Sequence, residues 1–326
     1  MESEEFVLVR ELLRSFAARH RIGSADEAEP AARAAAQEAL DGLGLAGLRR
    51  TAPPVATVQE CALLAEEHGR RPLTTSFLGT ALLAPEVVRL LGEAEFEGTP
   101  TVALAPDLGF PPASPGELVA WDCEGADSAL CVDAEGLVVR TGLGPPAPTA
   151  DLLRTVRCAL PGGPVVGRLA PEALLHWQAY ALVIVASELV GAARELVALS
   201  VEYARERRQY GRPIGSFQAV RHLLADATVL VEACTSATRY AAWCLDHEPP
   251  GRALTAARVA KAEAGSSAVE AVYTGMQVFG GIAQTWEHVA HLYLRRVLVG
   301  AAVLAPPGEL LPVLAEPEPE PEAVAP

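Results

Sequence analysis

The sequence has little positive charge for its length. Among 326 residues, 26 lysines and arginines stand against 41 aspartates and glutamates, which gives a formal net charge of −15. Binding to a phosphate backbone requires clustered cations, so nucleic acid is not an expected partner. Part of the negative charge lies near the end of the chain, where glutamate alternates with proline. That segment has nothing apolar enough to bury, so we predict disorder over residues 315–326.

The sequence also lacks segments that would carry the chain into or across a membrane. Its first residues, Met-Glu-Ser-Glu-Glu, are acidic where a secretory signal would be basic. The longest apolar run, residues 177–187, stops at Glu188 and is shorter than the ~18 residues that a membrane span needs. We therefore expect a cytoplasmic protein that makes no contact with a membrane.

Motifs of several chemistries are absent as well. The six cysteines include no Cys-x-x-Cys pair, which argues against a zinc site or disulfide framework and favours reduced, buried thiols. No P-loop, His-Glu-x-x-His or Gly-x-Ser-x-Gly motif occurs. No carboxylate or thiol clearly converges on the close pair His288 and His291, so a structural role is favoured over metal binding. Residues 42–47 match Gly-x-Gly-x-x-Gly but follow a predicted helix, so they do not indicate a nucleotide site.

The pattern of apolar residues changes twice along the chain. Helical spacing dominates the first hundred residues, and short apolar runs bounded by turn residues then indicate strands of a small antiparallel domain. Residues 172–208 contain no proline and predict a helix of up to ~37 residues, which Pro171 would begin. Three more helical stretches follow, at roughly 217–246, 253–278 and 287–303. Long antiparallel helices with short connections pack best as a four-helix bundle.

These patterns predict a mainly α fold with a β insert. Half of the residues are hydrophobic, so the chain can bury a substantial core. We expect an N-terminal helical domain at 1–98, a small middle β domain at 99–168, a C-terminal four-helix bundle at 169–314, and the disordered tail at 315–326.

Residues 203–218 are the most informative segment. They predict a helix that ends near Arg207, a turn at 211–213, and a new helix that starts near Ser216. Guanidinium groups near a helix C-terminus complement the helix dipole, so a structural role is one interpretation. Arg207 and Gln209 on a rigid helix end could instead hold a diphosphate by two-point contact.

This segment resembles the acyl-CoA dehydrogenases. Their bundle carries the pattern Arg-x-x-[Phe/Tyr]-Gly-x-x-Ile-x-x-x-Gln, which residues 207–218 match. Residues 277–281 match the family's Gln-x-x-Gly-Gly motif. The Thr-Trp-Glu-His at 285–288 is most similar to the actinobacterial branch that acts on steroid and other bulky acyl-CoA thioesters. The resemblance covers about 172–296 and is weaker in the first hundred residues, where 66–70 are similar to a Glu-Leu-Gly-Arg segment.

The resemblance implies that FAD lies across a subunit interface. The implied cofactor-binding residues are Arg207, Gln209, Tyr210, Gln218, Gln277, Gly280 and Gly281. In the family, Arg207 and its neighbours in the first motif correspond to residues that contact the flavin nucleotide held mainly by the adjacent subunit. The second motif corresponds to residues that line the adenosine and pyrophosphate side. Glycines allow close approach of a ligand, and they also cap helices; the two roles can coexist.

The sequence departs from the family where the chemistry takes place. Acyl-CoA dehydrogenation needs a carboxylate base that removes the α-proton. Without gaps, the family's two positions for this glutamate fall at Leu304 and Ala181, and neither side chain accepts a proton. Glu188 lies about two helical turns beyond Ala181 and is a candidate for a displaced base, with helix packing as the alternative. Residues 105–109 and 124–127 replace segments that in the family help to hold the flavin ring and the substrate.

These departures predict a short, degenerate subunit that pairs with a longer acyl-CoA dehydrogenase chain. In such a heterotetramer the flavin would bind only at the mixed interface. The implied reaction is FAD-dependent α,β-desaturation of an acyl-CoA thioester, with electrons passed to an electron-transfer flavoprotein. Two alternatives remain: a self-sufficient homo-oligomer with a displaced base, and a non-catalytic assembly protein that kept the fold.

Overall fold

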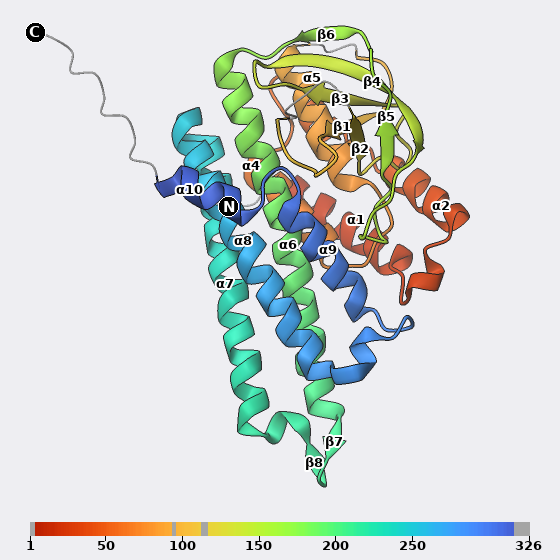
Figure 1. The fold of residues 1–326 in the computed structure, drawn as a ribbon, viewed down its shortest axis with the longest axis vertical. Coiled ribbons are helices and arrows are strands. Elements are labelled where there is room, and N and C mark those ends of the chain that lie inside the picture. The colour runs from red at the N-terminus through yellow and green to blue at the C-terminus, as the bar shows by residue number, and fades with distance from the viewer. Residues whose placement is uncertain (1–3, 93–95, 112–116, 316–326) are drawn as a thin grey trace, which may run out of the picture.

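The computed structural model describes residues 4–92, 96–111 and 117–315. It confirms the predicted fold class, mainly α with a β insert (Figure 1). The predicted disordered tail lies outside the described residues, except for Ala315. That residue ends a short helix, α10 (Pro307–Ala315), which the sequence did not predict.

The N-terminal region is helical. Its helices are α1 (Glu4–His20), α2 (Pro30–Asp41), α3 (Gly47–Arg50), α4 (Val58–Gly69) and α5 (Ala84–Leu91), with a 3₁₀ turn at Ala25–Glu27 and a π-helical turn at Leu78–Leu83. Helix α4 begins with a capping box, in which Thr57 and Glu60 satisfy each other's backbone N–H groups. Helix α5 ends at Gly92, whose φ of 75° is the left-handed conformation typical of a helix end.

A six-stranded sheet follows. Its strands are β1 (Pro100–Leu104), β2 (Leu118–Trp121), β3 (Ser128–Val132), β4 (Leu137–Pro146), β5 (Arg157–Ala159) and β6 (Val165–Arg168), in the order β3-β1-β2-β5-β4-β6. An additional β3–β4 pairing closes β1 to β5 into a small barrel. The expectation of a purely antiparallel domain is wrong, because β1 and β3 run parallel. Since β2 is antiparallel to β1, the short connection after β2 returns the chain to the start of β1, and β3 then runs in the same direction.

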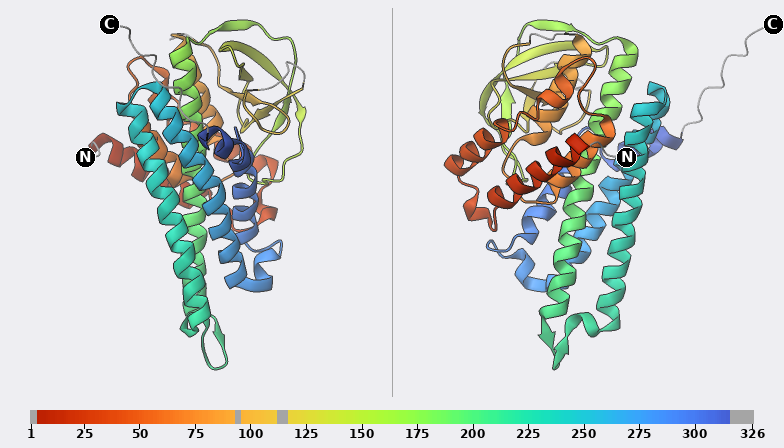
Figure 2. Two further views of the ribbon diagram at one scale, coloured as in Figure 1. Left: turned by 60° about the vertical axis from the view of Figure 1, so that its left-hand side comes forward. Right: turned by 180° about the vertical axis from the view of Figure 1, so that it is seen from behind.

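The C-terminal region is built on long helices. They are α6 (Pro171–Glu206), α7 (Gln218–His247), α8 (Pro250–Phe279) and α9 (Ala290–Ala302), and a hairpin of β7 (Arg208–Gln209) and β8 (Arg212–Pro213) joins α6 to α7. Helix α6 packs on α7, α8 and α9, and its N-terminal half lies beside the strands (Figures 1 and 2). In the described ranges, no helix combines the length and apolar character that a membrane crossing requires.

Helix α4 crosses α6 in direct backbone contact. A Cβ on Gly69 would stand 2.3 Å from the carbonyl oxygen of Glu188, and a Cβ on Gly191 would stand 2.0 Å from the carbonyl oxygen of Glu66. Any larger residue at either position would push the helices apart. The two glycines therefore bring the N-terminal helices against the bundle, and the buried residues beside them come within hydrogen-bonding distance of each other.

Candidate functional site

The first predicted motif forms a hairpin that projects from one end of the bundle (Figure 1). Arg207 follows the last residue of helix α6, and its carbonyl oxygen accepts a 2.7 Å hydrogen bond from the N–H of Ile214. Tyr210 and Gly211 form the turn with φ values of 53° and 78°. Two consecutive residues with positive φ are typical of a tight hairpin turn. The hairpin thus holds the motif in a defined shape.

The side chains of this hairpin face away from the rest of the chain. Arg207 and Gln209 are exposed, and Tyr210 is 93% exposed. Within the described residues, the Arg207 guanidinium makes no hydrogen bond or ion pair. By contrast, the Arg212 guanidinium lies 4.1 Å from the centre of the Phe217 ring. Arg207 therefore remains available to an anion that comes from outside the chain.

The second predicted motif lies at the end of helix α8. Gly280 has a φ of 70° and caps the helix, which confirms the structural role considered for it. Gly281 has no such backbone requirement. Both glycines are exposed, and a Cβ on either would meet no atom within 4 Å. Gln277, one turn earlier, is also exposed. This surface would admit a ligand close to the backbone.

The structure brings the two motifs to the same end of the bundle. The rings of Tyr203 and Phe279, which stand next to the two motifs in the sequence, have their centres 5.0 Å apart. Ala204 and Val278 share a small apolar cluster with Leu224 of α7. Gln218, at the start of α7, is exposed at this end too.

These groups fit the nucleotide part of FAD. An unpaired guanidinium suits a diphosphate, exposed amides offer hydrogen bonds, and the open glycines allow close approach. All seven of the predicted cofactor-binding residues are exposed on the surface of this chain.

The two positions at which the family carries its base lie in one pocket, on the opposite part of the bundle from the hairpin. Ala181 of α6 and Leu304 both line a cavity of about 270 Å³, together with Trp177. The carboxylate among the lining residues is Glu309 of α10, which is exposed to solvent. The sequence analysis missed Glu309 because it lies in a helix that was not predicted.

Backbone hydrogen bonds within this chain fix one wall of this pocket. Leu304 N–H donates to the Leu108 carbonyl oxygen at 2.8 Å, and Phe110 N–H donates to the Leu304 carbonyl oxygen at 2.9 Å. Leu304 is 4% exposed, and the Phe110 ring centre lies 4.8 Å from that of Trp177. One of the segments that replace family residues, 105–109, therefore pairs with the segment around Leu304, which stands at the later base position.

Lys261 of α8 fixes the second of these segments. Its ammonium group is buried and donates to the carbonyl oxygens of Ala301 and Ala305 at 2.8 and 3.0 Å. Burial lowers the pKa of Lys261 to about 7. The segment that carries Leu304 is thus held from both sides.

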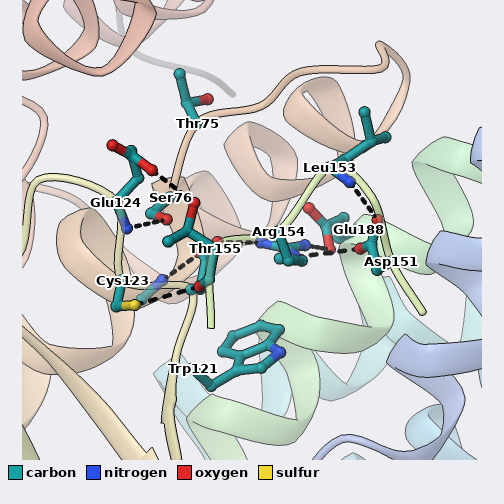
Figure 3. A network of polar contacts seen from close by, with 12 residues as sticks. Thr75, Ser76, Trp121, Cys123, Glu124, Asp151, Leu153, Arg154, Thr155 and Glu188 are labelled. Atoms are coloured by element: carbon teal, nitrogen blue, oxygen red, sulfur yellow. Dashed lines mark hydrogen bonds and ion pairs between the residues drawn. The ribbon is translucent and has the colours of Figure 1, made fainter. Parts of the chain in front are cut away.

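Glu188 lies in a buried network of charged groups (Figure 3). It forms an ion pair with Arg154, accepts a 3.1 Å hydrogen bond from Nδ1 of His68 and lies 3.8 Å from Arg296. Burial alone would raise the pKa of Glu188, but Arg154, Arg296 and the His68 hydrogen bond outweigh burial and hold this pKa well below its usual range. Such a carboxylate is a poor proton acceptor.

This environment contradicts the displaced-base hypothesis for Glu188. The side chain is 2% exposed, and it does not line the pocket that contains Ala181. Arg154 also bonds to Asp122 at 2.7 Å, so the network joins α4, the barrel and α6. The alternative role that the sequence analysis gave, packing between helices, is the one that these contacts support.

The remaining histidine pair makes structural contacts. Nδ1 of His288 accepts a 3.2 Å hydrogen bond from Ala290 N–H, and the His291 ring stacks on Trp286 at 5.5 Å. Over the described part of the chain, no three His, Cys, Asp or Glu residues come together in a way that would hold a metal ion.

A helical N-terminal unit, a small β barrel and a long-helix bundle together form the acyl-CoA dehydrogenase fold. A family model described as "Acyl-CoA dehydrogenase, C-terminal domain" matches residues 180–303. The chain is 30% identical to the acyl-CoA dehydrogenase IpdE2 of Mycobacterium tuberculosis over 316 residues, which cover 94% of this chain and 95% of the relative. The chain therefore belongs to the acyl-CoA dehydrogenase family.

Solved structures share the fold. A variant of the Tcur3481-Tcur3483 steroid ACAD has a TM-score of 0.72 at 23% identity, with 95% of this chain and 96% of that chain covered. The ChsE4-ChsE5 complex of Mycobacterium tuberculosis has a TM-score of 0.71 at 19% identity, with 97% and 99% covered. FAD, the cofactor predicted from the sequence, is the cofactor that membership of this family implies.

Proposed function

We propose that this chain is a subunit of an FAD-dependent acyl-CoA dehydrogenase that contributes flavin-binding residues to a catalytic partner chain. The reaction of the complex is α,β-desaturation of an acyl thioester. FAD supplies the acceptor for hydride from the β-carbon, and the base comes from the partner. The observation that carries this proposal is the contrast between an open nucleotide-contact surface and a pocket whose two base positions hold Ala181 and Leu304.

The open surface supports contribution to a flavin held by another chain. Among the described residues, the side chains of Arg207 and Gln209 make no hydrogen bond or ion pair, and Tyr210, whose ring contacts Phe217, is 93% exposed. Gly280 and Gly281 leave free surface beside them. A guanidinium that faces solvent can pair with a diphosphate that a neighbouring polypeptide presents.

The residues at the two base positions support the absence of an independent catalytic centre. Leu304 occupies one base position and is hydrogen-bonded to the barrel loop, and Ala181 occupies the other. The buried Glu188 is held ionised by two arginines and does not line this pocket. The described lining contains no buried carboxylate. The partner chain must then supply the proton acceptor.

The partner is a longer acyl-CoA dehydrogenase chain, and the assembly is a heterotetramer with flavin at the mixed interfaces. Two proteins of similar fold, the Tcur3481-Tcur3483 steroid ACAD and the ChsE4-ChsE5 complex, are each named for two gene products. We infer a bulky, steroid-type acyl-CoA substrate and an electron-transfer flavoprotein as acceptor. The free cysteines, most of them buried, support a cytoplasmic location.

Co-expression tests this proposal. The chain should be colourless when purified alone and should form a yellow complex when co-expressed with the acyl-CoA dehydrogenase encoded beside it. Subunit stoichiometry and visible flavin absorbance are the measurements. A yellow isolated chain that desaturates an acyl-CoA would refute the proposal and favour the self-sufficient enzyme, for which Glu309 is the carboxylate in reach of the pocket. A colourless complex would favour an assembly protein.

A further inference from the structure

The pocket beside Ala181 and Leu304 retains the properties of a ligand site although it lacks a base. It lies between α6, α8 and α10, and its volume is about 270 Å³. Most of its wall is apolar, and Trp177, Leu254 and Leu310 are among the lining residues. The hairpin lies at the other end of the bundle (Figure 1), so this pocket is separate from the surface assigned to the flavin nucleotide.

The volume limits the size of a ligand. A cavity of roughly 150 Å³ holds one benzene molecule, so this pocket has room for a hydrocarbon body of about ten carbon atoms. A fused tetracyclic skeleton would exceed that space.

The polar groups in the wall are mostly donors, and two of them lack partners. Trp177 is 1% exposed, and its buried indole N–H has no hydrogen-bond acceptor among the described residues. Arg258 of α8 is half-buried, and its guanidinium forms no hydrogen bond or ion pair to any described residue. Glu309 lies on the exposed side of the pocket and forms no ion pair with Arg258 among the described contacts. An apolar wall with an unpaired cation and an unpaired donor fits an amphiphilic anion.

We propose that this pocket binds an apolar carboxylate of up to about ten carbon atoms, with the hydrocarbon body against Leu254 and Leu310 and the carboxylate paired with Arg258. The Trp177 N–H offers a second donor to the ligand. The ligand is held and not converted, because a carboxylate has a far less acidic α-proton than a thioester. The inference does not depend on the proposed flavin contacts, since none of the residues involved belongs to the hairpin or to the end of α8.

Octanoate is the probe that tests this inference. We expect saturable binding with one site per chain in isothermal titration calorimetry, both for the isolated chain and for its complex. Arg258→Met keeps most of the apolar length of the side chain and removes the charge. It should weaken octanoate binding about tenfold, which is the size expected for loss of one charge-assisted contact. Octan-1-ol, which has the same chain without a charge, should bind both proteins equally.

Two further variants complete the test. Ala181→Leu should fill the pocket and weaken octanoate and octan-1-ol alike, whereas Glu309→Gln should not weaken octanoate. Circular dichroism checks that each variant is folded. Arg258 is only half-buried, so we expect Arg258→Met to fold, and this variant decides the test if Ala181→Leu does not fold. Absence of saturable octanoate binding, or an affinity that Arg258→Met leaves unchanged, would overturn the inference. Flavin content of the complex is measured separately, so failure here is distinguishable from failure of the proposed function.

Discussion

The hairpin end of the bundle and the interior around Glu188 contain the same kinds of charged groups and use them in opposite ways. At the hairpin, Arg207 is exposed and unpaired among the described residues. In the interior, Arg154 is 2% exposed on its side chain and contacts Asp122 and Glu188. A charged motif therefore indicates a ligand site only where this chain leaves the charge without a partner. Substitutions in the interior should therefore change stability, and substitutions at the hairpin should change flavin binding.

The largest expected effect is on the buried network. Glu188→Gln removes a negative charge that pairs with the buried Arg154. Breaking such a buried ion pair lowers the free energy of unfolding by about 3–5 kcal/mol. Urea unfolding of the isolated chain measures this loss. Glu232→Gln is the matched control: Glu232 also pairs with an arginine, at 2.8 Å, but is 58% exposed on its side chain, so we expect a change of at most about 1 kcal/mol.

Glu188→Gln also separates the structural role from a catalytic one. If the variant kept its stability while the complex lost turnover, Glu188 would be a base, and the comparison between the two regions would fail.

The next effect concerns flavin binding. Arg207→Ala should lower the affinity of the complex for FAD about tenfold or more, because a charge-assisted contact to a diphosphate is lost. The unfolding midpoint of the isolated chain should not change, since the side chain is exposed. Arg205→Ala is the control, because Arg205 is also exposed and pairs with Glu202 on the same helix at 2.8 Å. Equal flavin affinity in both variants would contradict the assignment of Arg207.

A smaller effect follows from the pH dependence of the interior. Lys261 is the one lysine in the sequence, and burial lowers its pKa to about 7 in the folded chain. The unfolded chain keeps the usual, higher pKa and binds more protons above pH 7, so Lys261 makes stability rise with pH there, by about 1 kcal/mol or less between pH 7 and 8. Lys261→Met should remove this rise from the unfolding free energy. An identical pH profile in both proteins would show that the buried ammonium keeps its ordinary pKa.

The smallest effect on stability is expected at Gly281, for which Gly280 is the contrast. Gly280→Ala places a Cβ on a residue with a φ of 70° and should cost roughly 1–2 kcal/mol of stability. Gly281→Ala has open space and no such φ, so stability should stay within about 0.5 kcal/mol. FAD affinity of the complex should nevertheless fall in Gly281→Ala. Unchanged affinity would mean that Gly281 does not approach the cofactor.

Features that depend on local sequence could be predicted. The long helix α6, the turn after it and the cap at Gly280 follow from proline and glycine positions and from helical spacing. The motif that begins at Arg207 identified the family for the same reason, because its residues are close in sequence.

Features that depend on distant pairs could not be predicted. The hydrogen bonds between Leu304 and the loop at 108–110 join segments almost two hundred residues apart. Neither segment has a sequence pattern that predicts the pairing. Arg154 looks like a surface residue in the sequence, and its burial follows from charges that three separate regions supply. Glu188 was misjudged as a candidate base because helical spacing gives its distance from Ala181 but not its partners.

Titration with FAD tests the central claim most directly. The isolated chain and its co-purified complex, both stripped of flavin, are titrated in a calorimeter. We expect no FAD to bind to the isolated chain and one FAD to bind for each copy of this chain in the complex. Stoichiometric binding of FAD to the isolated chain would contradict the claim.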